Sequence, residues 1–260
     1  MKTKMYHIDL DESMIDGAKV VLMPGDPFRV EPIAREIAAT YGGEARQLAW
    51  HREYCTWIAQ VDEKNVLVTS TGIGGPSTAI AVEELAKVGV KTFLRVGTTG
   101  AIRNHLKIGD VVVTTGAVRL DGASKDYAPI EYPAVASHSV VTALTKGAKE
   151  AKVGCHVGIT ASSDTFYPGE ERSDTYSGYI LRRLKGLTDE LAGLNVLNYE
   201  MEAATLLTMT SAMGLKGGCI TAVINVRGVE GESVKHDSLE IGENNVIKSA
   251  VAALRLLTTG

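Results

Sequence analysis

The strongest constraint on the fold is a regular alternation of short β-branched runs with longer segments of helical periodicity. Strand-like runs occupy residues 19–26, 65–72, 91–97, 110–118, 155–163 and 217–226, and helical patterns occupy 28–39, 76–89, 200–214 and 244–257. Strands separated by helices of this length form a parallel or mixed sheet covered on both faces. No internal repeat, low-complexity tract or linker divides the chain. We therefore predict an α/β fold, a single domain over residues 1–260 with a central mixed, twisted β-sheet flanked by helices.

Composition excludes several classes of function. The formal net charge is −4 and no basic run occurs, which argues against a general nucleic-acid binder, because affinity for phosphate backbones comes from clustered Lys and Arg. The three cysteines, Cys55, Cys155 and Cys219, are far apart and odd in number, as expected of reduced thiols. Acidic residues stand where a signal peptide needs an apolar core, and no apolar run reaches membrane-spanning length. We expect a cytoplasmic protein without a membrane partner.

Glycine and polar clusters follow several of the predicted strands. They are Gly25-Asp26 and residues 71–75, 97–100 and 162–165. In α/β sheets, ligands bind where strands end and loops lead into helices. We therefore expect these clusters to converge on one rim of the sheet.

Arg95 stands in the apolar run FLRVGTTG, residues 93–100. A guanidinium is always charged and is costly to bury without an anionic partner. Either a carboxylate elsewhere in the chain neutralises Arg95, or the anion is a substrate. The neighbouring Thr98 hydroxyl and backbone N–H groups would suit a tetrahedral oxyanion, which accepts many hydrogen bonds.

Two glycine-containing turns allow both an anion-binding and a purely structural interpretation. In MPGDPFR, residues 23–29, Gly25 and a helix start could bring N–H groups to an anion, or simply form a capped turn. The segment TGIGGPST, residues 71–78, lacks the third glycine and distal acid of a dinucleotide fingerprint and the Lys-Ser/Thr of a P-loop. A phosphate-sized ligand and plain turn chemistry both remain open there.

Two further segments contain groups that suit a sugar and a flat ring. In NYEMEAA, Glu200 and Glu202 are two residues apart, so in extended chain both carboxylates point the same way. They could bind the adjacent hydroxyls of a ribose, or act as acids at a helix N-terminus. The segment TFYPGEER, residues 165–172, could hold a planar heterocycle or form a solvated loop. Taken together, the clusters describe a phosphate, a sugar and a base.

The chain resembles the uridine phosphorylases of the nucleoside phosphorylase family from about residue 7 to its C-terminus. The segments that carry the resemblance are MPGDPFRV, HREYCTW, TSTGIGGPSTAIAVEELAKVGVKTFLRVGTTGAI, GDVVVTTGAVRLDGAS, VGITASSDTFYPG, DTYSG and NYEMEAATLLTM. The resemblance implies a pentosyltransferase that cleaves uridine with phosphate to uracil and ribose 1-phosphate. It also implies a homohexamer of dimers with shared active sites, inorganic phosphate as co-substrate and no organic cofactor.

The resemblance also implies a role for particular residues. Phosphate would be bound by Gly25, Arg29, Arg95 and Thr98, with Arg52 from a neighbouring subunit. Ribose would be bound by Thr98, Glu200, Met201 and Glu202, with His7 from that neighbour. Phe166, Glu170 and Arg172 would face the base and Arg227 would support Arg172, while a potassium ion at the dimer interface would use Glu53, Ile73 and Ser77. Arg172, Arg95 and Glu202 are the expected catalytic groups, and phosphate would be the counter-ion of the buried arginines.

Two places depart from the family pattern. In VINVRG, residues 223–228, Asn225 stands two residues before Arg227, which reorders the family's Asn-Arg pair. Glu170 stands where uridine phosphorylases have Gln in YPG-Q-E-R, and an ionised carboxylate can only accept hydrogen bonds. Glu170 could be protonated, could pair with Arg172 or Arg227 and leave the pocket, or could change the preferred base. The alternatives are therefore a phosphorylase for a purine or another pyrimidine, or a catalytically impaired nucleoside-binding homologue. Arg227 favours pyrimidines, because similar purine enzymes place Asp there.

Overall fold

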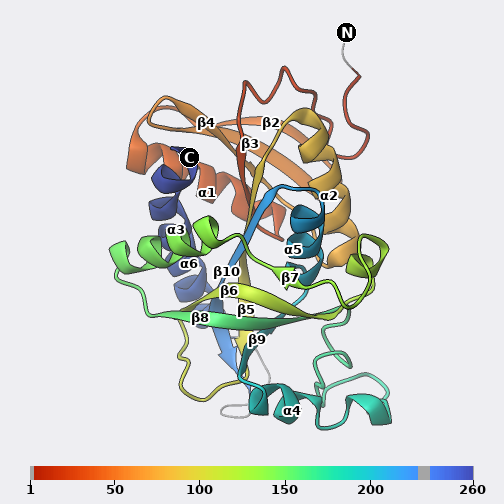
Figure 1. The fold of residues 1–260 in the computed structure, drawn as a ribbon. Coiled ribbons are helices and arrows are strands. Elements are labelled where there is room, and N and C mark those ends of the chain that lie inside the picture. The colour runs from red at the N-terminus through yellow and green to blue at the C-terminus, as the bar shows by residue number, and fades with distance from the viewer. Residues whose placement is uncertain (1–2, 228–234, 260) are drawn as a thin grey trace.

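The computed structural model describes residues 3–227 and 235–259 (Figure 1). The strands are β1 (Val20–Met23), β2 (Arg46–His51), β3 (Tyr54–Val61), β4 (Lys64–Thr69), β5 (Thr92–Ala101), β6 (Val111–Leu120), β7 (Ala134–Val135), β8 (Cys155–Ser163), β9 (Val196–Glu200) and β10 (Lys216–Val226). The α-helices are α1 (Val30–Tyr41), α2 (Gly75–Val88), α3 (His138–Glu150), α4 (Leu187–Gly193), α5 (Ala203–Ala212) and α6 (His236–Thr258). Short 3₁₀ turns lie at Pro27–Arg29, Ala123–Asp126 and Arg182–Leu184.

The strands form one mixed sheet. Strand β1 pairs in parallel with β4 and β5, and β5 pairs in parallel with β10. Strands β2 and β3 extend the sheet beyond β4 in antiparallel hairpins. On the other side β5, β10, β6, β8 and β9 pair in a closed circuit, so this part of the sheet curls into a small barrel. The C-terminal ends of the parallel strands β1, β4, β5 and β10 consequently meet at one rim, the usual place for a ligand.

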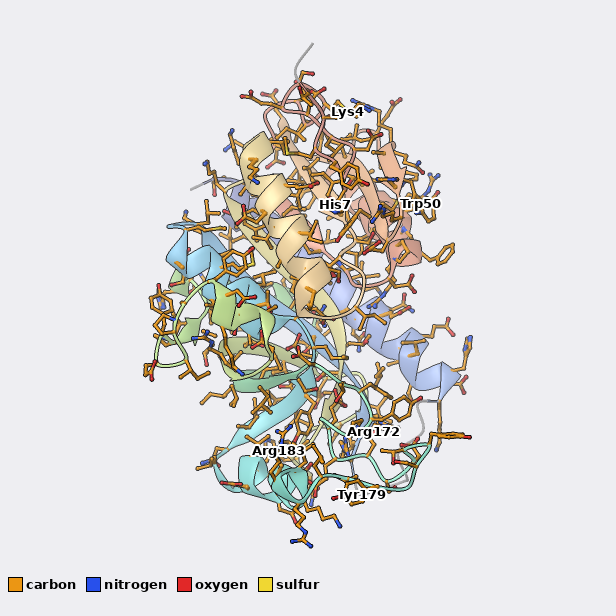
Figure 2. All side chains as sticks on the ribbon, turned by 90° about the vertical axis from the view of Figure 1, so that its right-hand side faces the viewer. Lys4, His7, Trp50, Arg172, Tyr179 and Arg183 are labelled. Atoms are coloured by element: carbon orange, nitrogen blue, oxygen red, sulfur yellow. The ribbon has the colours of Figure 1, made fainter. Side chains whose placement is uncertain are left out.

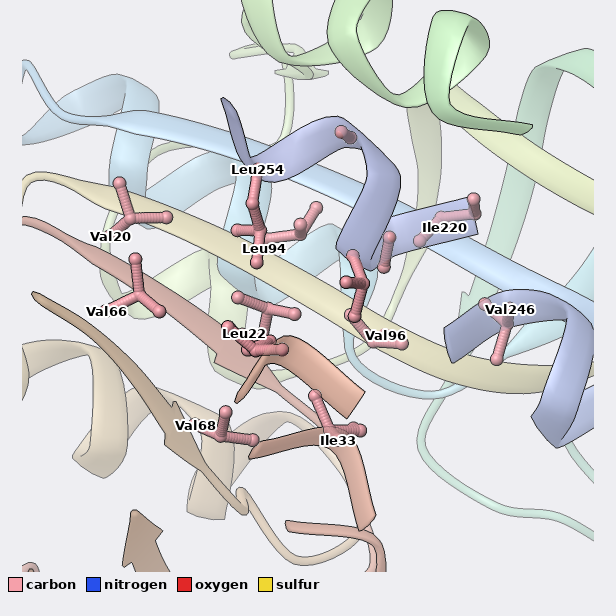
Figure 3. Close-up of a cluster of buried hydrophobic side chains, with 14 of the residues drawn as sticks. Val20, Leu22, Ile33, Val66, Val68, Leu94, Val96, Ile220, Val246 and Leu254 are labelled. Carbon is pink, nitrogen blue, oxygen red and sulfur yellow. The ribbon is translucent and has the colours of Figure 1, made fainter. Parts of the chain in front are cut away.

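Successive residues of β1 supply the two halves of the core, because side chains alternate across a sheet. Val20 and Leu22 belong to the cluster packed against α1, α3 and α6, part of which is drawn in Figure 3. Val21 and Met23 belong to the cluster packed against α2 and α5. Figure 1 shows these two groups of helices on opposite sides of the central strands. An apolar residue at every position of a strand thus indicates that both faces of the sheet are buried there.

The predicted α/β class and central mixed sheet are confirmed, but the bounds of several elements differ, and β2, β3, β7, β9, α3 and α4 had no predicted counterpart. Strand β5 does not end at Gly97 but continues to Ala101, because β10 and β9 pair with its last residues. The last helix begins at His236 and not at 244. Gly242 resembles a helix boundary in sequence, yet it lies within α6, where an added Cβ would be 2.7 Å from Ile224. Within the described ranges, no helix combines the length and hydropathy needed to cross a bilayer.

Candidate active site

A cavity of about 540 Å³ opens at the rim formed by the ends of β1, β4, β5 and β10. This volume suits a small-molecule ligand. Of the predicted site residues, the following line it: Gly25, Arg29, Ile73, Arg95, Thr98, Phe166, Glu170, Arg172, Glu200, Met201, Glu202 and Arg227. The cavity therefore brings together the segments that the sequence assigned to phosphate, sugar and base. His7, Arg52, Glu53 and Ser77 are absent from its described lining.

Arg95 lies at the floor of this cavity, held by two carboxylates. Its Nε is 2.7 Å from Oε2 of Glu200, and its Nη2 is 2.5 Å from Oε2 of Glu202. All three side chains are almost fully buried. The guanidinium folds back over the backbone of its own strand, since a Cβ on Gly97 would be 2.8 Å from Nη2. Gly97 is thus required by the path of the arginine side chain.

The expectation that phosphate is the counter-ion of Arg95 is wrong. The chain itself supplies the anions, which is the first of the two possibilities that the sequence left open. Burial alone would lower the pKa of Arg95, but the carboxylates of Glu202 and Glu200 outweigh it and raise the pKa. Arg95 therefore remains a cation whose charge is already balanced within the protein. Its position in the cavity lining still allows an additional ligand contact.

Glu200 and Glu202 both face Arg95, as their two-residue spacing predicted, but their other contacts differ. The Glu200 carboxylate also accepts hydrogen bonds from the backbone N–H groups of Glu202 and Ala203 and from the Ser162 hydroxyl. Glu200 thus serves the N-terminus of α5, in line with the structural alternative. Glu202 accepts from Gly74 N at 2.6 Å, and its burial raises its pKa.

Arg29 provides a second cation at the same rim. The turn after β1 places it there: Asp26 accepts from Phe28 N at 2.9 Å and Pro27 begins the 3₁₀ turn that ends at Arg29. Nε of Arg29 is 3.4 Å from Oε1 of Glu243, and burial lowers the pKa of Arg29. Its Nε and Nη1 are buried and make no hydrogen bond to any described residue. Buried guanidinium donors of this kind are suited to an anionic ligand.

The cavity lining also contains an aromatic ring, two further arginines and a carboxylate. The Arg172 guanidinium lies 4.3 Å from the centre of the Phe166 ring. Arg227 lies over Tyr199 and donates from Nη2 to the Glu171 carbonyl. The expected support of Arg172 by Arg227 stays a prediction.

Glu170 is buried in the lining of the cavity and has not left it. Its Oε2 is 3.8 Å from Nη1 of Arg227, and 6% of the residue is exposed. Burial raises the pKa of Glu170 to about 7, against the opposing effect of Arg227 and Arg172 and with a further increase from Glu200 and Glu202. Of the outcomes considered for this position, departure from the pocket is therefore excluded.

His7 lies on a different part of the molecule, because Figure 2 shows the His7 label toward one end and the Arg172 label toward the other. Arg52 is over the Tyr6 ring, and Tyr6 is in edge contact with His7. Neither residue lines the cavity of its own chain. This arrangement is compatible with a contribution to a second copy's site.

Glu84 holds His7 and was not singled out by the sequence. Its carboxylate accepts from His7 N and Ile8 N, and Oε1 is 2.7 Å from His7 Nδ1. Burial would raise the pKa of Glu84, but the hydrogen bonds from His7 and Ile8 outweigh it and lower the pKa. The sequence does contain a signal for Glu84: it lies on the same buried face of α2 as Ala81 and Val88, where a charged side chain needs a partner.

Glu53, Ile73 and Ser77 surround Gly72, as a shared site requires. A Cβ on Gly72 would be 3.0 Å from Glu53 Cγ and 3.3 Å from Ser77 Oγ, and Ser77 donates to the Ile73 carbonyl at 3.1 Å. No cluster of three or more His, Cys, Asp or Glu side chains suited to a metal occurs in the part of the chain that the structure describes. The oxygen groups here are those that hard cations prefer.

Eight further residues line the cavity: Asp26, Pro27, Gly72, Thr99, Gly100, Tyr199, Ile224 and Asn225. Asn225 lies at an irregularity of β10, where the register with β5 shifts between Val223 and Asn225. Such bulges redirect side chains beside binding sites. A bulge has no clear sequence signal in VINVRG, whereas Tyr199 and Thr99 are next to residues already singled out.

Comparison with known proteins agrees with this geometry. The chain is 50% identical to uridine phosphorylase of Salmonella typhimurium and 50% identical to that of Escherichia coli, in each case over 98% of this chain and 99% of the relative. It is 46% identical to uridine phosphorylase of Haemophilus influenzae, over 97% of this chain and 98% of the relative. The sequence model of the phosphorylase superfamily matches residues 19–258. The chain therefore belongs to the phosphorylase superfamily.

Proposed function

We propose that the protein is a pentosyltransferase that cleaves uridine with inorganic phosphate, releasing uracil and ribose 1-phosphate. The observation that carries this proposal is the 50% identity to uridine phosphorylases over nearly the whole of both chains. The cavity supports it, because one end contains Arg29 and Arg95 and the other contains Phe166 and Arg172. The comparisons do not favour a purine preference or loss of catalysis.

Phosphate would bind at the end formed by Gly25, Arg29, Arg95 and Thr98. Arg29 supports this assignment most directly, because its Nε and Nη1 are buried without a hydrogen bond to a described residue. Arg95 would contact phosphate while it stays paired with Glu200 and Glu202, and would not act as a lone cation. Such preorganised groups orient an anion without reorganising during the reaction.

Ribose would lie against Thr98, Met201 and Glu202, between the phosphate and base ends. Phosphate attacks C1′ as the glycosidic bond breaks, and positive charge develops on the sugar in an oxocarbenium-like transition state. The buried Glu202 carboxylate, bound to Arg95 and to Gly74 N, would lie near this charge and stabilise it. Holding phosphate and nucleoside together supplies the proximity that the attack needs.

The departing uracil carries negative charge on its carbonyl oxygens. Arg172 would stabilise this charge, and its stacking on Phe166 fixes the plane of its donors. Phe166, which is 40% exposed, would cover the flat face of the base. Arg227, beside Glu170 and Tyr199, would assist from the same end.

A second copy of the chain would complete the site. Large apolar side chains, Tyr6, Phe28, Trp50 and Ile73, are exposed on the face that also contains His7 and Arg52, and Phe28 contacts Trp50 at 5.8 Å between ring centres. We infer that dimers form through this face, with His7 reaching ribose and Arg52 reaching phosphate, and that dimers assemble into a homohexamer. Glu53, Ile73 and Ser77 would contribute one half of a potassium site there.

The proposed function is tested by incubating the protein with uridine in the presence and absence of phosphate. We expect uracil and ribose 1-phosphate only when phosphate is present. Uracil release that is equally fast without phosphate would reject phosphorolysis and indicate hydrolysis. A parallel measurement with inosine tests base class, and faster cleavage of inosine than of uridine would reject the pyrimidine assignment.

A further inference from the structure

The Arg29 side chain reaches the proposed phosphate site from a short turn. It follows β1 in the 3₁₀ turn Pro27–Arg29, lines the cavity and is 16% exposed. Its Nη2 atom approaches the start of that turn, because a Cβ added to Gly25 would be 4.0 Å from it. A long arginine side chain loses much rotamer freedom when a ligand orders it. A contact that orders the side chain beforehand therefore favours ligand binding.

Glu243 of α6 supplies such a contact. Its Oε1 is 3.4 Å from Arg29 Nε, and 28% of its side chain is exposed. Burial lowers the pKa of Arg29, and the carboxylate of Glu243 opposes this more than any other described carboxylate does. Nε and Nη1 of Arg29 make no hydrogen bond to any described residue, so the ion pair leaves these donors available to an anion. Glu243 itself is absent from the described lining of the cavity.

The packing of α6 fixes the place of Glu243. The preceding residue, Gly242, is buried against β10, where an added Cβ would be 2.7 Å from Cγ2 of Ile224, a residue of the cavity lining. Val246 lies one turn beyond Glu243 on the same face of the helix and is buried in the core cluster that also contains the start of α1. The core-facing side of α6 thus presents a half-buried carboxylate beside the rim of the cavity. A carboxylate in such a place needs a partner of opposite charge.

We propose that Glu243 is a positioning residue for phosphate: its carboxylate holds the Arg29 guanidinium at the phosphate end, so that phosphate affinity depends on a residue outside the described lining. This inference rests on the proposed function, because it takes phosphate to be the anion that Arg29 binds.

The sign of the effect separates positioning from simple electrostatics. A carboxylate near a bound anion repels it, so removing this charge would by itself strengthen phosphate binding. Loss of the contact that orders Arg29 acts in the opposite direction and weakens phosphate binding. We expect the second effect to be the larger, because Arg29 has donors toward the ligand and Glu243 contacts it from outside the described lining.

The test is calorimetric titration of wild type and Glu243→Gln with inorganic phosphate. The amide has nearly the shape of the carboxylate but lacks its charge. The titration is made at about pH 8, because burial raises the pKa of Glu243 and the carboxylate must be ionised. We expect the dissociation constant for phosphate to rise about threefold to tenfold, and the KM for phosphate to rise with it. An unchanged constant overturns the inference, and a lower one does so too, because it would mean that Glu243 competes with phosphate for Arg29.

Two comparisons test whether the effect passes through Arg29. Glu243→Asp keeps the charge and should bind phosphate more tightly than Glu243→Gln. In the Arg29→Met background, Glu243→Gln should cause no further loss of phosphate affinity, since the two residues act as one unit. Losses that simply add in the double variant overturn the inference.

Glu240→Gln is the matched control, because Glu240 is exposed about one turn earlier on the same helix and loses the same charge. It should keep the wild-type dissociation constant, and a rise equal to that of Glu243→Gln would overturn the inference. Uridine cleavage by the wild type, with and without phosphate, tests the proposed function separately. Cleavage that requires phosphate, together with equal phosphate affinity of wild type and Glu243→Gln, rejects the inference alone. A wild type that neither binds phosphate nor requires it for cleavage rejects both.

Discussion

The Arg95 guanidinium lies between two carboxylates of the chain, with Nε 2.7 Å from Glu200 Oε2 and Nη2 2.5 Å from Glu202 Oε2. This cluster connects the interior of β5 with the end of β9 and the start of α5 across the floor of the cavity. The same contacts therefore position Glu202 for its proposed role at the ribose and hold two parts of the fold together. Substitutions here should affect stability and catalysis at once.

Replacing Arg95 with Ala should lower both the free energy of unfolding and the rate of phosphorolysis. The substitution leaves two buried carboxylates without their cation, which costs about 3–5 kcal/mol. Loss of a preorganised group beside the reacting atoms should reduce kcat by at least about a hundredfold. Urea denaturation and uridine turnover measure the two effects on the same sample.

The variant Arg95→Lys distinguishes these roles. Lysine keeps the positive charge but lacks the fork that spans Glu200 and Glu202. We expect it to recover part of the stability and little of the activity. Full activity in a protein with Lys at this position would show that the geometry of the cluster has no catalytic importance.

Replacing Arg29 with Met should weaken phosphate binding with little loss of stability. Its Nε and Nη1 are buried without hydrogen bonds to described residues, so their removal leaves few groups unsatisfied. A charged hydrogen bond contributes about 1.5–3 kcal/mol, so the KM for phosphate should rise about tenfold to a hundredfold. Steady-state kinetics at saturating uridine provide the measurement.

Arg35→Met is the matched control, because Arg35 is exposed on α1 and pairs with Glu31 four residues away. It should leave the KM for phosphate unchanged. If Arg29→Met also has the wild-type KM for phosphate but is strongly destabilised, Arg29 is a structural partner of Glu243 and the phosphate assignment is wrong.

The α/β class could be predicted because its signals are local. Runs such as VVLM in β1 are apolar at every position, which indicates burial on both faces, and Gly89 follows α2 in the left-handed conformation that favours glycine at a helix end. The continuation of β5 to Ala101 could not be predicted from Gly97–Gly100, because it depends on pairing with β9 and β10. Those partners are distant in sequence.

The candidate site also has features that the sequence predicts and features that depend on contacts between distant residues. Glycine and charged residues at strand ends identified most of the lining, and the spacing of Glu200 and Glu202 predicted that both point in one direction. The spacing does not say what they face. Arg95 is 105 residues away from Glu200, so its internal counter-ions could not be distinguished from an external anion. The contact of Glu84 with His7, across 77 residues, was missed for the same reason.

Replacing Glu84 with Gln should loosen the segment that contains His7. The carboxylate accepts from two backbone N–H groups and from the imidazole, and an amide cannot satisfy all of these donors as well. We expect a loss of about 1.5–3 kcal/mol in the free energy of unfolding. If His7 binds ribose as proposed, the KM for uridine should rise more than the KM for phosphate.

Glu83→Gln is the control for Glu84, since Glu83 is its neighbour on α2, does not contact His7 in the described contacts of α2, and lies 3.7 Å from the exposed Lys87. It should leave both KM values and stability near those of the wild type. Equal increases in the two KM values for Glu84→Gln would contradict a specific effect through His7 and indicate general disorder of the site.

Replacing Glu170 with Gln should stabilise the protein at neutral and alkaline pH. The pKa of Glu170 is raised by burial from 4.5 to about 7 in the folded state. Below about pH 4.5 the carboxyl group is neutral in both the folded and the unfolded chain, so its ionisation costs nothing. Between these values only the unfolded chain loses the proton, and stability falls as pH rises, until the folded group also ionises above about pH 7.

The accumulated difference corresponds to about 3 kcal/mol, because each unit of pKa shift is about 1.4 kcal/mol. Glu170→Gln removes this penalty, so its free energy of unfolding relative to wild type should increase from about pH 5 to about pH 8. Urea denaturation of both proteins at these two pH values measures the change, and Glu131→Gln, at an exposed position, should show none. A constant difference between Glu170→Gln and wild type would mean that Arg172 and Arg227 keep Glu170 ionised throughout. The two arginines would then outweigh the effect of burial, and the carboxylate would be a fixed acceptor at every pH.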